Sequence, residues 1–168
     1  MVSAVRKASA EYIGELVDKY GNMLLRIAFS YLKSKADAED AVQDVFLQVV
    51  EKEPAFNDEN HEKAWLIRTV INICKNNLGR FWNKNRVSID DIAEIAETDS
   101  YSTDNEVLAA VMALPEKYRV AVHMYYYEGY STAEIASLTG SNEPTVRSLL
   151  CRTRKKLKDE LKEDYDFE

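Results

Sequence analysis

The side chains best suited to a chemical task lie on one face of a predicted helix near the end of the chain. When Val146 and Leu149 face inward, helical periodicity turns Arg147, Ser148 and Cys151 outward near the start of that helix. Arginine and serine at such positions can hydrogen-bond to the edges of bases in a DNA groove. Further cations that can meet phosphates follow, namely Arg152, Arg154, Lys155, Lys156 and Lys158. A basic run alone is more often only solvated, so its setting decides.

The residues before this helix supply that setting, because they carry the signals of a helix and a turn. Ser131 and Glu134 have the spacing of a capping box, which marks the start of a helix. Gly140 is suited to end that short helix with a positive φ, and Asn142 is suited to cap the next one. Residues 131–158 therefore predict a helix-turn-helix whose second helix meets DNA.

Composition limits the class of protein and the kind of site. The chain has 168 residues, is 46% hydrophobic and contains five glycines and three prolines, which favours one or two globular helical domains over a turn-rich β protein. No apolar run approaches the ~20 residues that span a bilayer, so we expect no membrane insertion and a cytoplasmic location. Cys74, Cys151, His61 and His123 are scattered, so we expect no metal and no other cofactor. No cluster of a nucleophile, a base or metal ligands emerges, so we expect no enzyme.

The charges alternate in blocks along the chain, whose formal net charge is −7. Residues 64–86 contain no acid, whereas residues 87–106 contain no base. Residues 37–62 are strongly acidic, and the last predicted helix is basic again. Blocks of this kind predict separate surfaces for separate partners.

Apolar residues at helical spacing predict three helices in the first half of the chain. They cover residues 10–33, 34–52 and about 62–83, and Gly21 is a point at which the first helix can soften or divide. Residues 53–62 form a polar loop before the third helix. Three amphipathic helices of this length can bury one shared core.

The second half begins with a predicted linker. Residues 87–104 are acidic, rich in serine and threonine, and offer few apolar anchors. Two helices are predicted over residues 103–114 and 115–129, before the helix-turn-helix. The predicted fold class is therefore all-α, with small helical domains at 1–86 and 105–168 joined by an acidic linker.

Three stretches of the chain resemble, in the same order, parts of bacterial RNA polymerase sigma factors of the small extracytoplasmic-function group. The first two resemble the polymerase-binding helix and the −10-reading, promoter-melting helix of sigma domain 2, and the third resembles sigma domain 4, which reads the −35 element. They are DAEDAVQDVFLQVV at 37–50, KAWLIRTVINICKNNLGR at 63–80 and LPEKYRVAVHMYYYEGYSTAEIASLTGSNEPTVRSLLCRTRKKL at 114–157. The resemblance covers nearly the whole chain and implies a sigma domain 2-like bundle followed by a sigma domain 4-like helix-turn-helix.

The resemblance implies a non-enzymatic factor that binds core RNA polymerase and directs initiation at promoters with −35 and −10 elements. It implies contacts with the β′ clamp helices and the β flap of the polymerase, and an anti-sigma protein as a further partner. On the second helix the implied polymerase-binding residues are Asp37, Glu39, Asp40, Gln43, Asp44 and Phe46. An acidic face suits a basic partner, although acids near a helix start also serve solubility alone.

The resemblance also implies that the loop 53–62 captures a flipped base of the −10 element. Phe56, Asn57 and Asn60 would supply stacking and base-edge hydrogen bonds there, unless this is an ordinary polar surface loop. Trp65 has a spacing that fits the core better than a wedge between bases. The third helix would follow the melted strand with Arg68, Asn72, Lys75, Asn76 and Arg80.

For the −35 element, the resemblance implies major-groove recognition by the second helix of the helix-turn-helix. The implied contacts are Asn142, Glu143, Pro144, Thr145, Arg147, Ser148, Cys151, Arg152, Arg154 and Lys155. Two positions depart from the family pattern. Pro144 stands where the family often has glycine, and proline is tolerated in a first helical turn. Leu149 stands where a basic residue is frequent, which removes one backbone contact and leaves the promoter preference open.

Two other classes of protein stay open on the residues alone. One is a stand-alone helix-turn-helix regulator that uses residues 1–86 for dimerisation or effector binding and recognises an operator without polymerase. It explains the acid-free third helix poorly. The other is an adaptor that binds only proteins, and the basic outward residues after Val146 argue against it.

Overall fold

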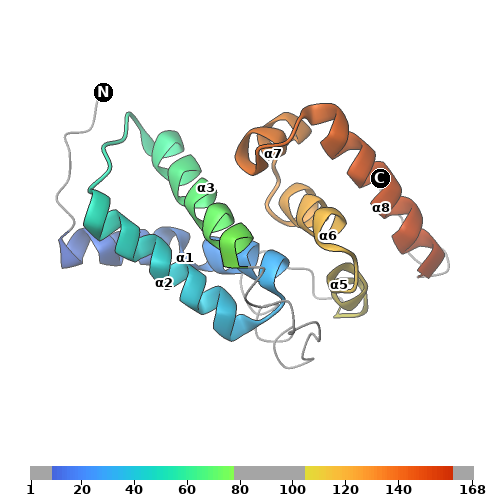
Figure 1. Ribbon diagram of the computed structural model, residues 1–168, viewed down its shortest axis with the longest axis horizontal. Helices are drawn as coiled ribbons and strands as arrows, with labels where there is room; N and C mark the ends of the chain where they lie inside the picture. Colours follow the sequence, from blue (N-terminus) through green and yellow to red (C-terminus); the bar gives the residue numbers. More distant parts are fainter. Residues whose placement is uncertain (1–8, 78–104, 161–168) are drawn as a thin grey trace. The chain divides into compact units, whose positions relative to one another are not determined.

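The chain folds into two compact units, Met1–Lys84 and Asn85–Glu168, in a computed structural model that describes residues 9–77 and 105–160 (Figure 1). Within these two ranges there are helices and connecting turns but no strand. The all-α fold class predicted from the sequence is confirmed. The predicted linker 87–104 lies outside the described residues, and the exact domain boundaries stay a prediction.

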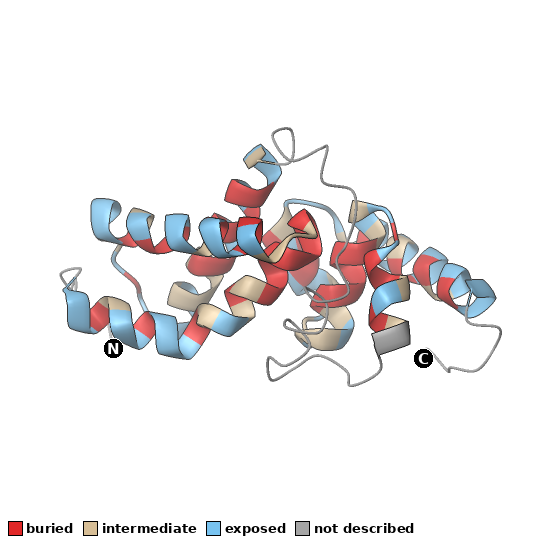
Figure 2. Cartoon of the chain, turned by 90° about the horizontal axis from the view of Figure 1, so that it is seen from below, coloured by how far each residue is buried: buried red, intermediate tan, exposed pale blue. Residues whose placement is uncertain are grey.

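Three helices form the first unit, namely α1 (Ala10–Leu32), α2 (Lys35–Lys52) and α3 (Glu59–Asn77), and each contacts the other two. Their buried residues recur at helical spacing and face one another (Figure 2). The core includes Leu16, Leu24, Ile27 and Phe29 from α1, Ala41, Val45 and Val49 from α2, and Leu66, Val70 and Cys74 from α3. This arrangement leaves one side of α2 and one side of α3 open to partners.

Capping residues set the ends of α1 and the end of α2. The Ser9 hydroxyl accepts a hydrogen bond from the Tyr12 amide at 3.1 Å, which satisfies one of the free N–H groups at the start of α1. The residues that follow the two helices are left-handed, with φ of 61° at Lys33 and 44° at Glu53. Because α1 runs unbroken through Gly21, the division considered there from the sequence does not occur.

The start of α3 differs from the prediction. This helix begins at Glu59, three residues before the predicted start at about residue 62. The reason is a local cap, because the Asp58 carboxylate accepts the His61 amide at 2.8 Å and the Asp58 carbonyl accepts the Glu62 amide at 3.1 Å. The loop therefore shortens to 53–58, and the residues at 78–83 predicted as the end of this helix lie outside the described part of the chain.

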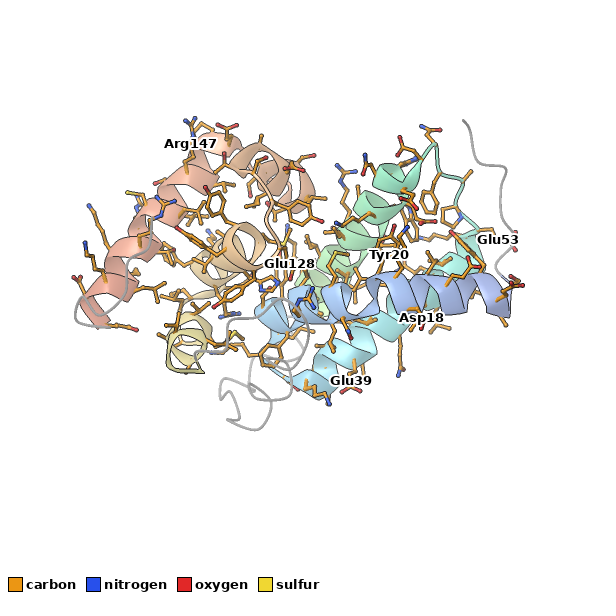
Figure 3. The ribbon with its side chains drawn as sticks, turned by 180° about the vertical axis from the view of Figure 1, so that it is seen from behind. Asp18, Tyr20, Glu39, Glu53, Glu128 and Arg147 are labelled. Carbon is orange, nitrogen blue, oxygen red and sulfur yellow. The ribbon has the colours of Figure 1, made fainter. Side chains whose placement is uncertain are left out.

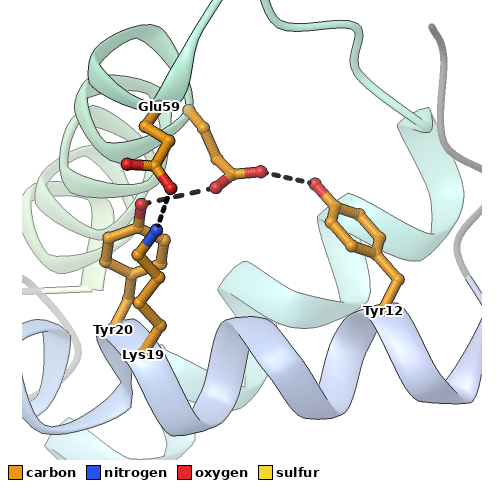
Figure 4. Close-up of polar contacts among 5 residues, drawn as sticks. Tyr12, Lys19, Tyr20 and Glu59 are labelled. Atoms are coloured by element: carbon orange, nitrogen blue, oxygen red, sulfur yellow. Dashed lines mark hydrogen bonds and ion pairs between the residues drawn. The ribbon is translucent and has the colours of Figure 1, made fainter. Parts of the chain in front are cut away.

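A carboxylate on α3 joins this helix to two tyrosines of α1 (Figure 4). The hydroxyl of Tyr12 donates to Glu62 at 2.9 Å, and the hydroxyl of Tyr20 donates to the same carboxylate at 3.3 Å. Burial and the nearby Glu62 charge raise the pKa of the Tyr20 hydroxyl, which keeps it a donor at neutral pH. Beside them, Lys19 and Glu59 form an ion pair in which both side chains are exposed.

We predict that Glu62→Ala lowers the free energy of unfolding of the first unit by about 2 kcal/mol, because it leaves two part-buried hydroxyls without their charged acceptor. Both tryptophans, Trp65 and Trp82, belong to this unit, so urea unfolding followed by tryptophan fluorescence reports on it alone. The matched control is Glu59→Ala, which removes an acid that is 79% exposed and should change stability by less than about 0.5 kcal/mol. Equal effects of the two substitutions would contradict the prediction.

The described part of the second unit contains α5 (Asn105–Met112), α6 (Glu116–Val122), the π-helix η1 (His123–Tyr127), α7 (Thr132–Thr139) and α8 (Glu143–Glu160). Both α6 and α7 pack on α8, and α5 contacts α6 and α8. The buried core includes Leu108, Met112, Val120, Met124, Ile135, Leu150 and Leu157. Helix α8 is thus held along one side by the rest of its unit.

The predicted helix-turn-helix is confirmed in α7 and α8. The Ser131 hydroxyl accepts the Glu134 amide, and the Glu134 carboxylate accepts the Ser131 amide, each at 3.1 Å, so the capping box is complete. Gly140 ends α7 with φ of 74°, a conformation that glycine adopts without strain. The Asn142 side chain then accepts the Thr145 amide at 3.0 Å and starts α8.

The helix predicted over residues 115–129 contains a π-helical turn that hydrophobic periodicity did not reveal. In η1 the Glu128 amide donates to the His123 carbonyl, five residues earlier, at 3.1 Å. The side chains of these two residues are buried and approach to 2.8 Å between His123 Nε2 and Glu128 Oε2, without the alignment of a hydrogen bond. Gly129 follows with φ of 76° and ends the turn. Two contacts between the same pair of residues therefore brace η1.

Candidate functional site

The residues predicted to face DNA lie on the open side of α8 and in the turn before it. Val146 and Leu150 are buried against the core and Leu149 is half-buried, so this helix is oriented as its apolar stripe predicts. Of the predicted contacts, Glu143 and Arg154 are half-buried. The others are exposed, namely Asn142, Pro144, Thr145, Arg147, Ser148, Cys151, Arg152 and Lys155. We call these ten residues the α8 face.

Arg147 is the most prominent cation near the start of this face. Its side chain is 62% exposed and points outward (Figure 3), and its Nη2 lies 3.2 Å from Glu143 Oε1 one turn earlier. This spacing directs the guanidinium toward the beginning of the helix, where recognition helices meet base edges. Pro144 lies in the first turn and does not interrupt α8, as expected for proline at that position.

Two cations further along α8 are held by tyrosines that the sequence analysis left without a role. Arg154 Nε donates to the Tyr126 hydroxyl at 2.7 Å, and Lys156 Nζ lies 5.3 Å from the ring centroid of Tyr118. Helical spacing places tyrosines on a face of the preceding helix but does not say which residue of α8 each one meets.

An open groove of about 480 Å³ lies between α2 and α3. It brings together Arg68, Asn72 and Asn76, which were predicted to follow a melted strand. The full lining is Gln48, Lys52, His61, Trp65, Arg68, Thr69, Asn72, Ile73 and Asn76, which we call the α2/α3 groove. Sequence reasoning missed the contributions of Gln48, Lys52 and His61, because only the packing of α2 on α3 brings them to the same place.

The other predicted −10 residues lie beside this groove or outside the described chain. Asn57 is exposed in the loop, and Asn60 is exposed in the first turn of α3. Lys75 is exposed on α3 without lining the groove. Arg80 lies outside the described residues.

The α2/α3 groove offers hydrogen-bond donors beside an aromatic ring. His61 Nδ1 accepts the Asn57 amide at 3.1 Å, so in the neutral imidazole the proton is on Nε2, which is a donor. Lys52 Nζ donates to Gln48 Oε1 at 3.2 Å and keeps further N–H groups for a ligand. Trp65 is half-buried and lines the groove, so it is neither a plain core residue nor an exposed wedge.

Phe56 is not available to stack on a base, contrary to the expectation from the sequence. Its ring is only 6% exposed and packs edge-on against His61 at 5.3 Å and Trp65 at 5.8 Å between centroids. An aromatic residue in a polar loop was expected to serve a ligand, but the hydrophobic effect favours burying this ring under the loop. Phe56 therefore supports the rings that line the groove from behind.

The exposed side of α2 carries most, but not all, of the predicted polymerase-binding residues. Asp37 and Phe46 are buried, at 4% and 9% exposure, and so do not belong to that side. Two apolar side chains that were not predicted there, Leu47 and Val50, are 56% and 46% exposed. We call the exposed set the α2 face, namely Glu39, Asp40, Gln43, Asp44, Leu47 and Val50.

Both units match known protein-family models. Residues 16–86 match sigma-70 region 2, and residues 104–157 match sigma-70 region 4. These are the two regions of bacterial transcription initiation factors that the order of helices, the groove and the helix-turn-helix define.

Relatives of similar length narrow this class. The chain is 31% identical over 144 residues to the ECF RNA polymerase sigma factor SigM of Mycobacterium tuberculosis, covering 85% of this chain and 74% of that protein. It is also 31% identical over 147 residues to the RNA polymerase sigma factor SigV of Bacillus subtilis, covering 83% and 85%. The chain therefore belongs to the extracytoplasmic-function group of RNA polymerase sigma factors, which bind core polymerase and direct initiation at promoters.

Two solved structures share the fold. One is the sigma factor RpoE of Bartonella quintana in complex with the anti-sigma factor NepR, with a TM-score of 0.69, 21% identity, and coverage of 94% of this chain and 100% of that one. The other is CnrH in complex with the cytosolic domain of CnrY, with a TM-score of 0.67, 24% identity, and coverage of 94% and 92%.

Proposed function

We propose that this sigma factor divides its work among the three surfaces defined above. The α8 face meets the −35 element, the α2/α3 groove holds a base of the opened −10 strand, and the α2 face docks on core polymerase. The observation that carries the proposal is the groove itself, which joins cations, amides and an aromatic ring from two helices in the unit matched to region 2. Such a combination fits an unstacked nucleotide.

For the −10 element, the groove offers what an extruded base requires. Taking a base out of the stack costs a few kcal/mol, and a receptor must return that through stacking and hydrogen bonds. Trp65 supplies a ring surface, and Arg68, Asn72 and Asn76 supply donors and acceptors on the same side of α3. Cations here also neutralise the phosphates of the melted strand.

For the −35 element, the start of α8 supplies base readout and its later residues supply phosphate contacts. A recognition helix meets bases with its N-terminal outward residues, which here are exposed. The later cations are sequence-independent contacts that set the register of the helix on the duplex. The net charge of −7 opposes DNA binding by the chain alone, so core polymerase must hold both surfaces near the promoter at high effective concentration.

We predict that Arg147→Ala weakens promoter binding by about 1–3 kcal/mol at −35 sequences where the guanidinium meets a guanine, and much less where that base pair is changed. Holoenzyme binding to duplex promoter fragments with single changes in the −35 element measures this. The control is Arg152→Ala, an exposed cation of the same helix, which should reduce binding equally for every sequence. An equal loss on all sequences for Arg147→Ala would reduce it to a phosphate contact.

The direct test of the whole proposal is transcription in vitro with purified core polymerase and a pool of genomic promoter fragments. The chain should direct start sites that core polymerase alone does not use, and these should share two sequence elements. Specific, tight binding of the isolated chain to an operator without any polymerase-dependent initiation would overturn the proposal.

Three further properties follow from membership in this group. We propose that the chain acts by binding and not by catalysis, as initiation factors do. We propose a cytoplasmic location, and no helix in the described ranges is both apolar and long enough to cross a bilayer. We also propose an anti-sigma protein as a partner, because two sigma factors with the same fold were solved with one.

A further inference from the structure

We infer that Tyr126 is a positioning residue for the −35 contact and that it orients the Arg154 guanidinium to grip a phosphate at the edge of the groove that α8 enters. This inference rests on the proposed −35 role of the α8 face. It adds a residue from outside the helix-turn-helix to the machinery that binds the promoter.

The first argument is the geometry of the Arg154 side chain. Its Nε donates to the Tyr126 hydroxyl at 2.7 Å, and its guanidinium carbon lies 6.0 Å from the centroid of the same ring. A guanidinium has five N–H donors in a planar fork. With Nε engaged, the four N–H groups of the two terminal nitrogens stay together on the far edge, which is the edge that binds a phosphate through two parallel hydrogen bonds.

The second argument is the place of Arg154 along α8. It follows Arg147 by seven residues, which is two helical turns, so the two cations lie on nearly the same side and about 10 Å apart along the axis. The major groove is about 12 Å wide, so a helix that reads bases at Arg147 places Arg154 near a flanking phosphate chain. An arginine held in one conformation there loses less entropy on binding than a free one.

The third argument is the stiffness of the segment that carries Tyr126. It belongs to η1, where the His123 carbonyl accepts the Glu128 amide at 3.1 Å and the two side chains are buried in contact at 2.8 Å. Tyr125 packs edge-on against Tyr126 at 5.0 Å between centroids. Tyr126 is thus an exposed side chain on a braced turn, which is a suitable support for a neighbouring cation.

The test measures binding of holoenzyme to a promoter fragment that the wild-type chain selects, with the −35 element located by footprinting. Tyr126→Phe should weaken binding by about 3-fold to 10-fold, the range of one hydrogen bond, and leave the salt dependence unchanged because no charge is lost. Arg154→Ala should weaken binding by about 10-fold and make the slope of log affinity against log salt less steep by about 1. Tyr126→Phe should have no further effect in the Arg154→Ala background.

The control is Tyr125→Phe, which removes the hydroxyl of the adjacent tyrosine, and it should leave binding unchanged. Thermal melting of each variant followed by circular dichroism tests folding, and the double-mutant cycle separates positioning from a general loss of stability, which would add to the effect of Arg154→Ala. Unchanged binding for Tyr126→Phe, or additive effects in the double variant, would overturn the inference. If Arg147→Ala and Arg154→Ala both leave binding unchanged, the proposed role of the α8 face fails instead.

Discussion

Reversing two charges on α2, by Asp40→Lys together with Asp44→Lys, should weaken the binding of core polymerase by at least about 100-fold, since like charges across an interface cost several kcal/mol. Both carboxylates are exposed on the α2 face and make no contribution to the core. The variant should therefore keep its helical circular dichroism and its tryptophan fluorescence. Co-purification with core polymerase, followed by titration of labelled chain into polymerase, measures the loss.

A control with the same change in net charge separates this surface from a general electrostatic effect. Glu11→Lys together with Asp18→Lys reverses two exposed acids of α1, and Asp18 lies on a different helix from Glu39 of the α2 face (Figure 3). This control should bind core polymerase within about threefold of the original chain, because salt screens charges beyond about 10 Å. Unchanged binding by the α2 variant, or equal losses in both, would count against the α2 face.

The second large effect is expected in the α2/α3 groove. Arg68→Ala together with Asn72→Ala should reduce formation of the open promoter complex on the order of 100-fold, because the pair supplies about 2–4 kcal/mol of contacts to an extruded base and its phosphate. Binding to the closed promoter should change far less, because α8 carries that step. Permanganate reactivity of unpaired thymines near the start site, compared with binding to the duplex, separates the two steps.

Lys75→Ala provides the matched control on the same helix. Lys75 is exposed on α3 but does not line the groove, so its loss should weaken opening only modestly and without preference for the −10 sequence. Should the Arg68 and Asn72 variant melt a promoter as readily as the original chain, the groove would have no part in capturing the strand.

Short-range signals in the sequence predicted the elements that carry function, and capping shows why. Ser131, Glu134, Gly140 and Asn142 act within one turn of their own position, so their side-chain chemistry determines the local backbone and the helix-turn-helix follows. The start of α3 was missed for the same kind of reason, because Asp58 was not recognised as its cap.

Burial at the edges of helical faces was the harder problem. Asp37 was expected outside because it is charged, yet it lies in the first turn of α2, where the helix dipole favours a carboxylate, and is buried there. Phe56 and Leu47 were exchanged in the opposite sense, since a loop aromatic is covered and a helical leucine is exposed. Periodicity gives the direction of a side chain, but only tertiary packing says whether another element covers it. Gln48 and Lys52 joined the groove in the same way.

The π-turn at His123–Tyr127 makes the length of the tyrosine run, and not only its composition, a constraint on how this chain can change through evolution. A π-turn accommodates one residue more than an α-turn. Loss of a single codon from this run would restore ordinary helical winding and swing everything that follows by about 100° around the axis. Such a deletion would leave every promoter-facing side chain present in the chain but aimed at the wrong place, whereas a point substitution leaves that aim intact.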